Sequence, residues 1–189
     1  MNKEFLINQI NSIENAKRVN RLRVANLVLK NKKLFPHLLE TVFEVNHKTS
    51  IKAAWVLEFV CAEKLDWLAP HLDYFTENIS KVKFDSAVRP ISKICNFLAL
   101  AYTSKKDSLV KELLTKSEID AIIESGFEWL IGEHKVAPKA YAMTILFLFG
   151  KNYPWVHEEL KIILQQNITK ESAAYKARGK ITLDLINKK

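Results

Sequence analysis

Glycine and proline are scarce in this chain of 189 residues, which contains only four glycines and five prolines. Because β-rich folds need many turn residues, this scarcity favours helices joined by short links. The glycine-dependent motifs GxGxxG, GxxxxGK[ST] and GxSxG are all missing, so the sequence offers no recognisable phosphate-binding loop or nucleophile elbow. We therefore expect an all-α protein, and more readily a binding protein than an enzyme.

Cysteine is scarce too, and the histidines are dispersed. Cys61 and Cys95 both lie in apolar stretches without CxxC spacing, and we expect buried thiols in a reducing cytoplasm rather than a disulfide. The five histidines form neither HExxH nor HxH. We therefore expect neither a metal site nor a cofactor.

Long apolar runs are missing as well. The most apolar stretch, "AYAMTILFLF", covers only 140–149 and is too short to span a bilayer. The first residues, "MNKEFLINQINSIE", lack the apolar core of a signal peptide. We expect a cytoplasmic protein without membrane contacts, folded as a single domain over 1–189.

Apolar residues recur at spacings of three and four along nearly the whole chain, which predicts helices. Pro36, Pro70 and Pro154 stand where first helical turns are expected. The residues expected as N-caps are Ser50, Asp85, Ser117 and Ser172. Ser117 and Asp120 also resemble a capping box. The predicted helices cover residues 3–13, 16–30, 36–46, 51–64, 70–79, 86–103, 118–131, 137–150, 154–165 and 172–187.

These helices form pairs, in which a first helix is followed by a second helix, and this pairing predicts a structural repeat. Pro-His-Leu occurs at 36 and again at 70, each time opening a first helix, and His37 and His71 have no recurring ligand partners. We therefore interpret the recurring Pro-His-Leu sequence as a sign of a structural repeat rather than as part of a metal site. A base recurs in the second helices at steps of 29, 37, 50 and 37 residues, and the long step contains a polar insertion near 104–117 with a short helix. The recurring bases are Arg23, Lys52, Arg89, Lys139 and Lys176.

The stretch "DSAVRPISKI", which begins at Asp85, resembles the second helix of HEAT repeats. Only this unit has the turn aspartate, and Pro90 occupies a position that the pattern gives to a helix former. The resemblance extends over four or five units and implies a HEAT/ARM-like α-solenoid of about five antiparallel helix pairs in a right-handed superhelix. More loosely, the whole chain is similar to small helical bacterial proteins sometimes labelled adenylosuccinate lyase, although it lacks a catalytic loop of that enzyme.

Charge divides unequally between the two helix types. The chain carries 29 bases against 21 acids, a net charge of +8, and its bases concentrate in second helices while its acids concentrate in first helices. Because second helices line the concave side of HEAT arrays, a basic groove is expected. The candidate groove residues are Arg23, Asn26, Lys52, Trp55, Glu58, Arg89, Lys93, Asn96, Lys139 and Lys176.

Within this set we expect Trp55, Glu58, Arg89 and Asn96 to meet in one recognition patch. The competing interpretation is that each base only pairs with a neighbouring turn. Glu58 is the only charge in "AAWVLEFVCA", so it must face water or pair with a base. Trp67, Trp129 and Trp155 are expected to be packing residues.

Three functions remain open at this point. The leading hypothesis is a non-catalytic scaffold whose groove binds an acidic protein segment. The second is a nucleic-acid-binding protein resembling HEAT-like DNA glycosylases, since basic grooves also bind phosphates. The third is the lyase activity that the looser likeness suggests.

Overall fold

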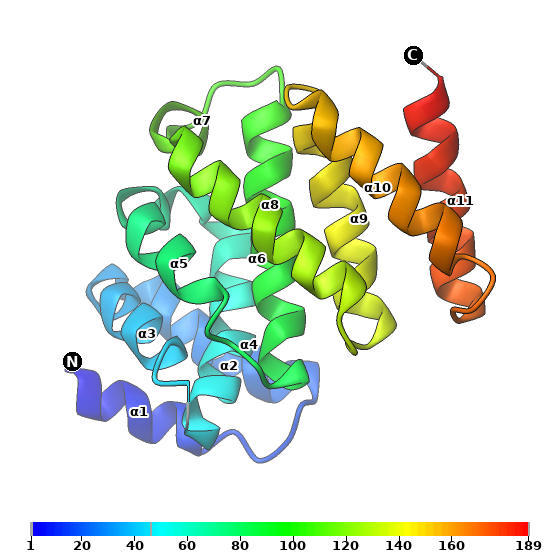
Figure 1. Cartoon of the computed structure of the whole chain (residues 1–189). Helices are drawn as coiled ribbons and strands as arrows, with labels where there is room; N and C mark the ends of the chain where they lie inside the picture. The colour runs from blue at the N-terminus through cyan, green and yellow to red at the C-terminus, as the bar shows by residue number, and fades with distance from the viewer. Residues whose placement is uncertain (1, 46, 189) are drawn as a thin grey trace.

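The computed structural model describes residues 2–45 and 47–188, and within them every regular element is helical. The predicted all-α class is therefore confirmed. Eleven α-helices are joined by short links and by three 3₁₀ turns in this part of the chain (Figure 1). The α-helices are α1 (Lys3–Asn11), α2 (Arg18–Lys30), α3 (Phe35–Val42), α4 (Lys48–Glu63), α5 (Leu72–Ile79), α6 (Asp85–Thr103), α7 (Leu109–Leu113), α8 (Lys116–Ile131), α9 (Val136–Gly150), α10 (Pro154–Asn167) and α11 (Ala173–Asn187).

The helices lie in two rows. Helices α2, α4, α6, α9 and α11 pack against one another in that order, and we call them the second-helix row. Helices α1, α3, α5, α8 and α10 form the first-helix row, in which α3, α5 and α8 lie in front of α4 and α6 in Figure 1. The rows are joined chiefly by α3 against α4 and by α8 and α10 against α9. Consecutive helices therefore alternate between the rows, apart from the short α7.

Side-chain caps explain the starts of α4 and α11. Ser172 accepts a hydrogen bond from the Tyr175 backbone and caps α11 as predicted. The predicted cap at Ser50 is wrong, because α4 begins at Lys48, three residues before the predicted start at residue 51. There the ring nitrogen of His47 accepts from the Thr49 backbone, and Ser50 is buried inside the first turns. The predicted cap at Asp85 is wrong too, because Asp85 is the first residue of α6 and Phe84 is its N-cap.

The start of α8 also differs from the prediction. A capping box is present, but it joins Thr115 to Glu118 rather than Ser117 to Asp120. The Glu118 carboxylate accepts from the Thr115 backbone N–H at 2.6 Å. Both pairs have the same spacing, and the structure uses the earlier one, so α8 begins two residues before the predicted start.

The segment 104–117 contains the predicted short helix, α7. The Ser108 hydroxyl accepts from the Lys111 backbone and caps it. Val110 and Leu114 are buried in the core. The insertion is therefore anchored by apolar side chains, and it also exposes Leu109 and Leu113.

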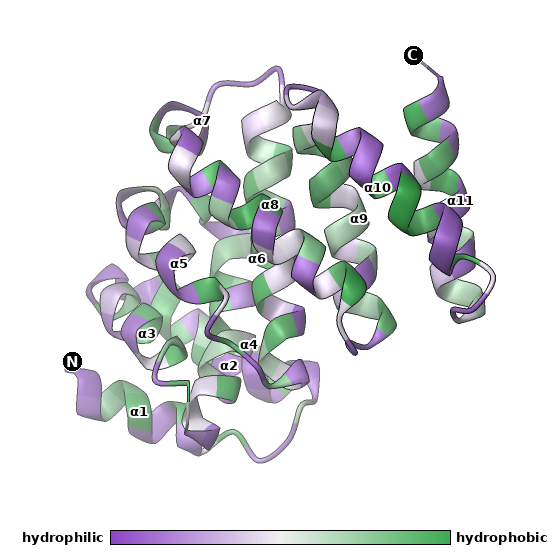
Figure 2. Ribbon diagram, viewed as in Figure 1, coloured by the Kyte–Doolittle hydropathy of each residue, from purple (hydrophilic) through white to green (hydrophobic). Residues whose placement is uncertain are grey.

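The hydrophobic core runs along the whole array, from Leu6 in α1 to Tyr175 in α11. Cys61 and Cys95 are part of it and are not bonded to each other, so the expectation of buried thiols is confirmed. Burial raises the pKa of both thiols. Figure 2 shows hydrophobic and hydrophilic residues alternating along α10, as expected for a helix with one buried face.

No helix in the described part of the chain is both long enough and apolar enough to cross a bilayer.

Candidate functional site

The second-helix row holds a charge cluster built around one buried carboxylate. Glu58 in α4 is only 3 % exposed. Its two carboxylate oxygens accept from Lys93 Nζ at 2.7 Å and from Arg89 Nη1 at 3.2 Å. Both bases lie one turn apart on α6, so the carboxylate joins α4 to α6. Of the two expected alternatives, facing water or pairing with a base, Glu58 therefore takes the second.

Arg21 brings a third base to this cluster from α2. Its guanidinium carbon lies 6.0 Å from the Trp55 ring centre and 5.2 Å from that of Phe59. Burial lowers its pKa, the Glu58 charge opposes that shift, and the Arg89 charge adds to it. Arg18 lies 5.0 Å from the same Phe59 ring. We call Arg21, Glu58, Arg89 and Lys93 the α4–α6 cluster, in which three bases surround one acid.

Trp55 fixes the start of α6 beside this cluster. Its indole N–H donates to the Ser86 carbonyl at 2.8 Å. That carbonyl belongs to the first turn of α6, one helical turn before Arg89. Trp55 therefore packs against Arg21 and anchors α6, and both roles are structural.

Asn96 does not join Trp55, Glu58 and Arg89. It lies two turns further along α6 and lines a hollow of about 530 Å³ between α6, α9 and α11. Arg178 of α11 lines the same hollow and donates to the Thr144 hydroxyl. The expected four-residue patch is thus reduced to three neighbours, because Asn96 is displaced along the helix.

The first two recurring bases, Arg23 and Lys52, form hydrogen bonds with residues in and next to α1. Arg23 donates to the side chains of Gln9 and Ser12, and Lys52 donates to the Asn11 carbonyl at 2.9 Å. These bonds hold α2 and α4 against the end of α1. Arg23 also lines a hollow of about 630 Å³ together with Asn26 and Lys30.

The last two recurring bases differ from each other. Lys139 is buried and forms an ion pair with Glu171, which lies in the link before α11. Its ammonium also lies 5.7 Å from the Tyr175 ring centre. Lys176 is half-buried, and its ammonium has no partner among the described residues. Pairing with a neighbouring turn therefore accounts for several of the predicted groove residues.

A further hollow lies between the start of α6 and the start of α9. Arg89 and Lys135 line it, together with Asp85, which pairs with His134 at 2.8 Å. Among the charged residues that line these three hollows, all but Asp85 are basic. Sequence reasoning did not select Arg21, Lys135 or Arg178 as site residues, since only the packing of α2, α9 and α11 brings them there.

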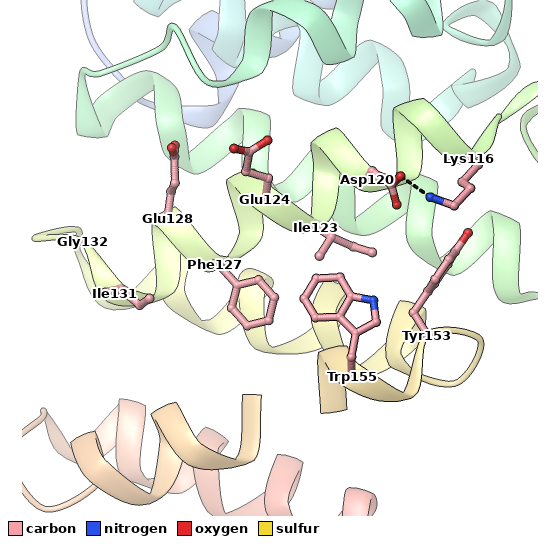
Figure 3. A pocket seen from close by; sticks show the side chains of 10 residues that line it. All are labelled: Lys116, Asp120, Ile123, Glu124, Phe127, Glu128, Ile131, Gly132, Tyr153 and Trp155. Carbon is pink, nitrogen blue, oxygen red and sulfur yellow. Dashed lines mark hydrogen bonds and ion pairs between the residues drawn. The ribbon is translucent and has the colours of Figure 1, made fainter. Parts of the chain in front are cut away.

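The first-helix row has a larger hollow, which the sequence did not indicate. It has a volume of about 850 Å³ and lies along α8 at the start of α10 (Figure 3). Trp155 is half-exposed there and stacks on Phe127 with ring centres 6.0 Å apart. The expectation that Trp155 is a packing residue is therefore wrong, whereas Trp129 is buried as expected. The lining residues are Lys116, Asp120, Ile123, Glu124, Phe127, Glu128, Ile131, Gly132, Tyr153 and Trp155.

In residues 2–45 and 47–188, no three His, Cys, Asp or Glu side chains converge where they could hold a metal ion. Comparison of the chain with protein-family models, with curated proteins and with solved structures gives no match.

Proposed function

We propose that this chain is a non-catalytic binding module whose second-helix row binds an acidic segment of a partner protein. In this proposal the rows form a HEAT-like α-solenoid of about five helix pairs in a right-handed superhelix, with the second helices on its concave side. The α4–α6 cluster is the observation that carries the proposal. It places three basic side chains around a single carboxylate.

The excess of bases over acids in this cluster favours the binding of a negatively charged group. Glu58 can neutralise one base, so the cluster keeps a net charge of about +2. Arg89 and Lys93 keep 42 % and 29 % of their side chains exposed, so an incoming carboxylate can reach them. Like charges held close together in a partly buried site repel one another. A partner carboxylate placed between them relieves that repulsion.

A neighbouring hollow extends this surface towards the start of α9. Arg89 and Lys135 line it. An extended acidic segment lying across α4, α6 and the start of α9 would meet Arg89, Lys93 and Lys135. The lack of a metal-binding cluster among the described residues, and of a recognisable catalytic motif in the sequence, is compatible with a binding role and does not carry the proposal.

A peptide-binding assay tests the proposal. A fluorescent peptide rich in Asp and Glu should bind the wild-type chain and bind Arg89→Gln about tenfold more weakly or worse, because a hydrogen bond to a charged group contributes about 1.5–3 kcal/mol. Lys106→Gln is the matched control, since it removes the same charge from an exposed side chain in the 104–117 segment. Equal weakening by both variants would contradict a specific site. Thermal melts of each variant report any loss of folding.

Nucleic acid is the competing ligand for a basic surface. Stacking of unpaired bases needs free aromatic faces, whereas Arg18 and Arg21 cover the faces of Phe59 and Trp55. This arrangement favours carboxylates over single-stranded nucleic acid. Single-stranded DNA should therefore bind more weakly than the acidic peptide at about 0.15 M salt. Tighter binding of DNA, with the steep salt dependence of counterion release, would reverse the assignment.

A further inference from the structure

We propose that the α8–α10 hollow is a second, independent binding site, which takes a basic amphipathic helix of a partner protein. The site has a row of acids on one side and an apolar floor on the other. It lies on the first-helix row and selects the charge opposite to that selected by the α4–α6 cluster. The proposal does not depend on what the second-helix row binds.

The acidic row consists of Asp120, Glu124 and Glu128, which are four residues apart along one face of α8. Like charges at this spacing destabilise a helix. Asp120 is relieved by Lys116 at 2.6 Å. Glu124 and Glu128 have neither an ion pair nor a side-chain hydrogen bond among the described residues. The row is therefore unfavourable for the isolated chain and would be relieved by a cationic partner.

Glu128 adds a second cost. It lies in the last turn of α8, which contains no basic residue. Acids near the C-terminus of a helix interact unfavourably with the helix dipole. An acid at this position lowers the stability of α8. The binding of a cationic partner explains its presence, whereas the stability of the helix does not.

The apolar floor lies beside the acidic row. Phe127 directly precedes Glu128, and Ile131 lies four residues beyond Phe127, so these two residues form a stripe next to the acids on α8. Trp155 of α10 extends this stripe, and its exposed fraction is 50 %, while that of Ile131 is 62 %. In Figure 3 the carboxylates of Glu124 and Glu128 point to one side of α8, and the rings of Phe127 and Trp155 lie on the other.

This geometry suits a helix better than a small cation or an extended chain. The hollow follows α8 from Lys116 to Gly132, a length of about 24 Å at 1.5 Å per residue. A helix lying along it would place apolar residues against Phe127 and Trp155 and, on the adjacent stripe, lysines or arginines against the acids. Acids spaced by four residues match bases spaced by four residues on such a partner.

The probe for this site is a fluorescein-labelled peptide of about 16 residues, with leucines along one helical stripe and lysines along the next. Glu124→Gln/Glu128→Gln should weaken its binding tenfold or more, or about 1.4 kcal/mol. Trp155→Ala should weaken it by a similar factor, because aromatic anchors dominate such interfaces. The matched control is Glu158→Gln/Glu159→Gln, which removes the same charge from exposed positions on α10.

Folding does not confound this test, since removing the acids of α8 relieves repulsion and should leave the melting temperature equal or higher. Equal weakening by the α10 control would overturn the proposal, as would unchanged binding to Trp155→Ala. Binding of an all-lysine peptide as tight as that of the leucine–lysine peptide would show charge attraction alone. Self-association of the wild-type chain that Glu124→Gln/Glu128→Gln abolishes would identify the occupant as a second copy instead.

Discussion

The acid Glu58 in the second-helix row and the acids Glu124 and Glu128 in the first-helix row differ in burial and in ion pairing. In the second-helix row the exposed bases gather around buried or half-buried acids, as Arg89 and Lys93 do around Glu58. In the first-helix row, Glu124 and Glu128 stand beside exposed aromatic rings and have no ion-pair partner among the described residues. The contrast is therefore between the paired, buried Glu58 and the exposed Glu124 and Glu128, since other acids of the first-helix row, such as Glu40 and Asp120, are paired.

This difference distinguishes a carboxylate that the folded structure requires from carboxylates that are free to bind a partner. A carboxylate that is 3 % exposed must be paired, because burying it alone costs several kcal/mol. An exposed carboxylate has no such requirement, so its position is free to serve a partner. Measurements of stability should therefore distinguish the two rows, and the substitutions below run from the largest expected effect to the smallest.

Gly150→Ala should have the largest effect, because Gly150 ends α9 where the chain crosses to the first-helix row. A Cβ there would lie 2.0 Å from Cδ2 of the buried His157 ring. That ring is fixed by its bond to the Phe147 carbonyl at 2.8 Å. We expect a loss of about 3 kcal/mol in the free energy of unfolding, measured by urea denaturation. Gly179→Ala is the control, since its Cβ meets only ordinary contacts and should be neutral or slightly stabilising.

Glu58→Gln should have the next largest effect. The substitution leaves Arg89 and Lys93 without their shared anion and adds to the repulsion from Arg21. Because both bases are partly exposed and can be rehydrated, we expect a loss of about 2 kcal/mol rather than the 3–5 kcal/mol of a fully buried pair. Glu124→Gln should change the free energy of unfolding by less than about 0.5 kcal/mol. Equal effects of the two variants would remove the distinction between the rows.

Glu128→Lys should have the smallest effect, and one of opposite sign. It places a base in the last turn of α8 and breaks the like-charge spacing with Glu124. We expect a gain of about 0.5 kcal/mol in the free energy of unfolding, read from chemical denaturation at low salt. The gain should shrink as salt is added. A loss of stability would mean that Glu128 already has a favourable role inside the folded chain.

Most helix positions could be predicted because apolar periodicity and N-terminal prolines act locally. Pro154 begins α10 as expected. The errors fall where two local signals compete: Thr115 and Ser117 each precede an acid by three residues, and periodicity does not choose between them. At Pro70 the chain forms a 3₁₀ turn over Ala69–His71 before α5 begins. Such boundaries depend on the packing of the flanking residues.

The candidate sites were less predictable than the helices. Glu58 stood out because a lone charge in an apolar stretch needs a partner, and α6 supplies that partner. Arg21 did not stand out, because its contact with Trp55 depends on how α2 packs against α4. Trp155 was misjudged for the same reason. A tryptophan in a first turn is buried or exposed according to which helix lies beside it.

The sequence by itself determined the helical class, most of the helix positions and the burial of both thiols, since each follows from hydrophobic periodicity and from the scarcity of turn residues. Only the tertiary structure decided which charges pair, which bases gather around Glu58 and which face of α8 stays open beside Trp155. The physical reason is that periodicity orients each helix towards a core. Contacts between helices far apart in the sequence depend on their relative placement, which no local pattern encodes.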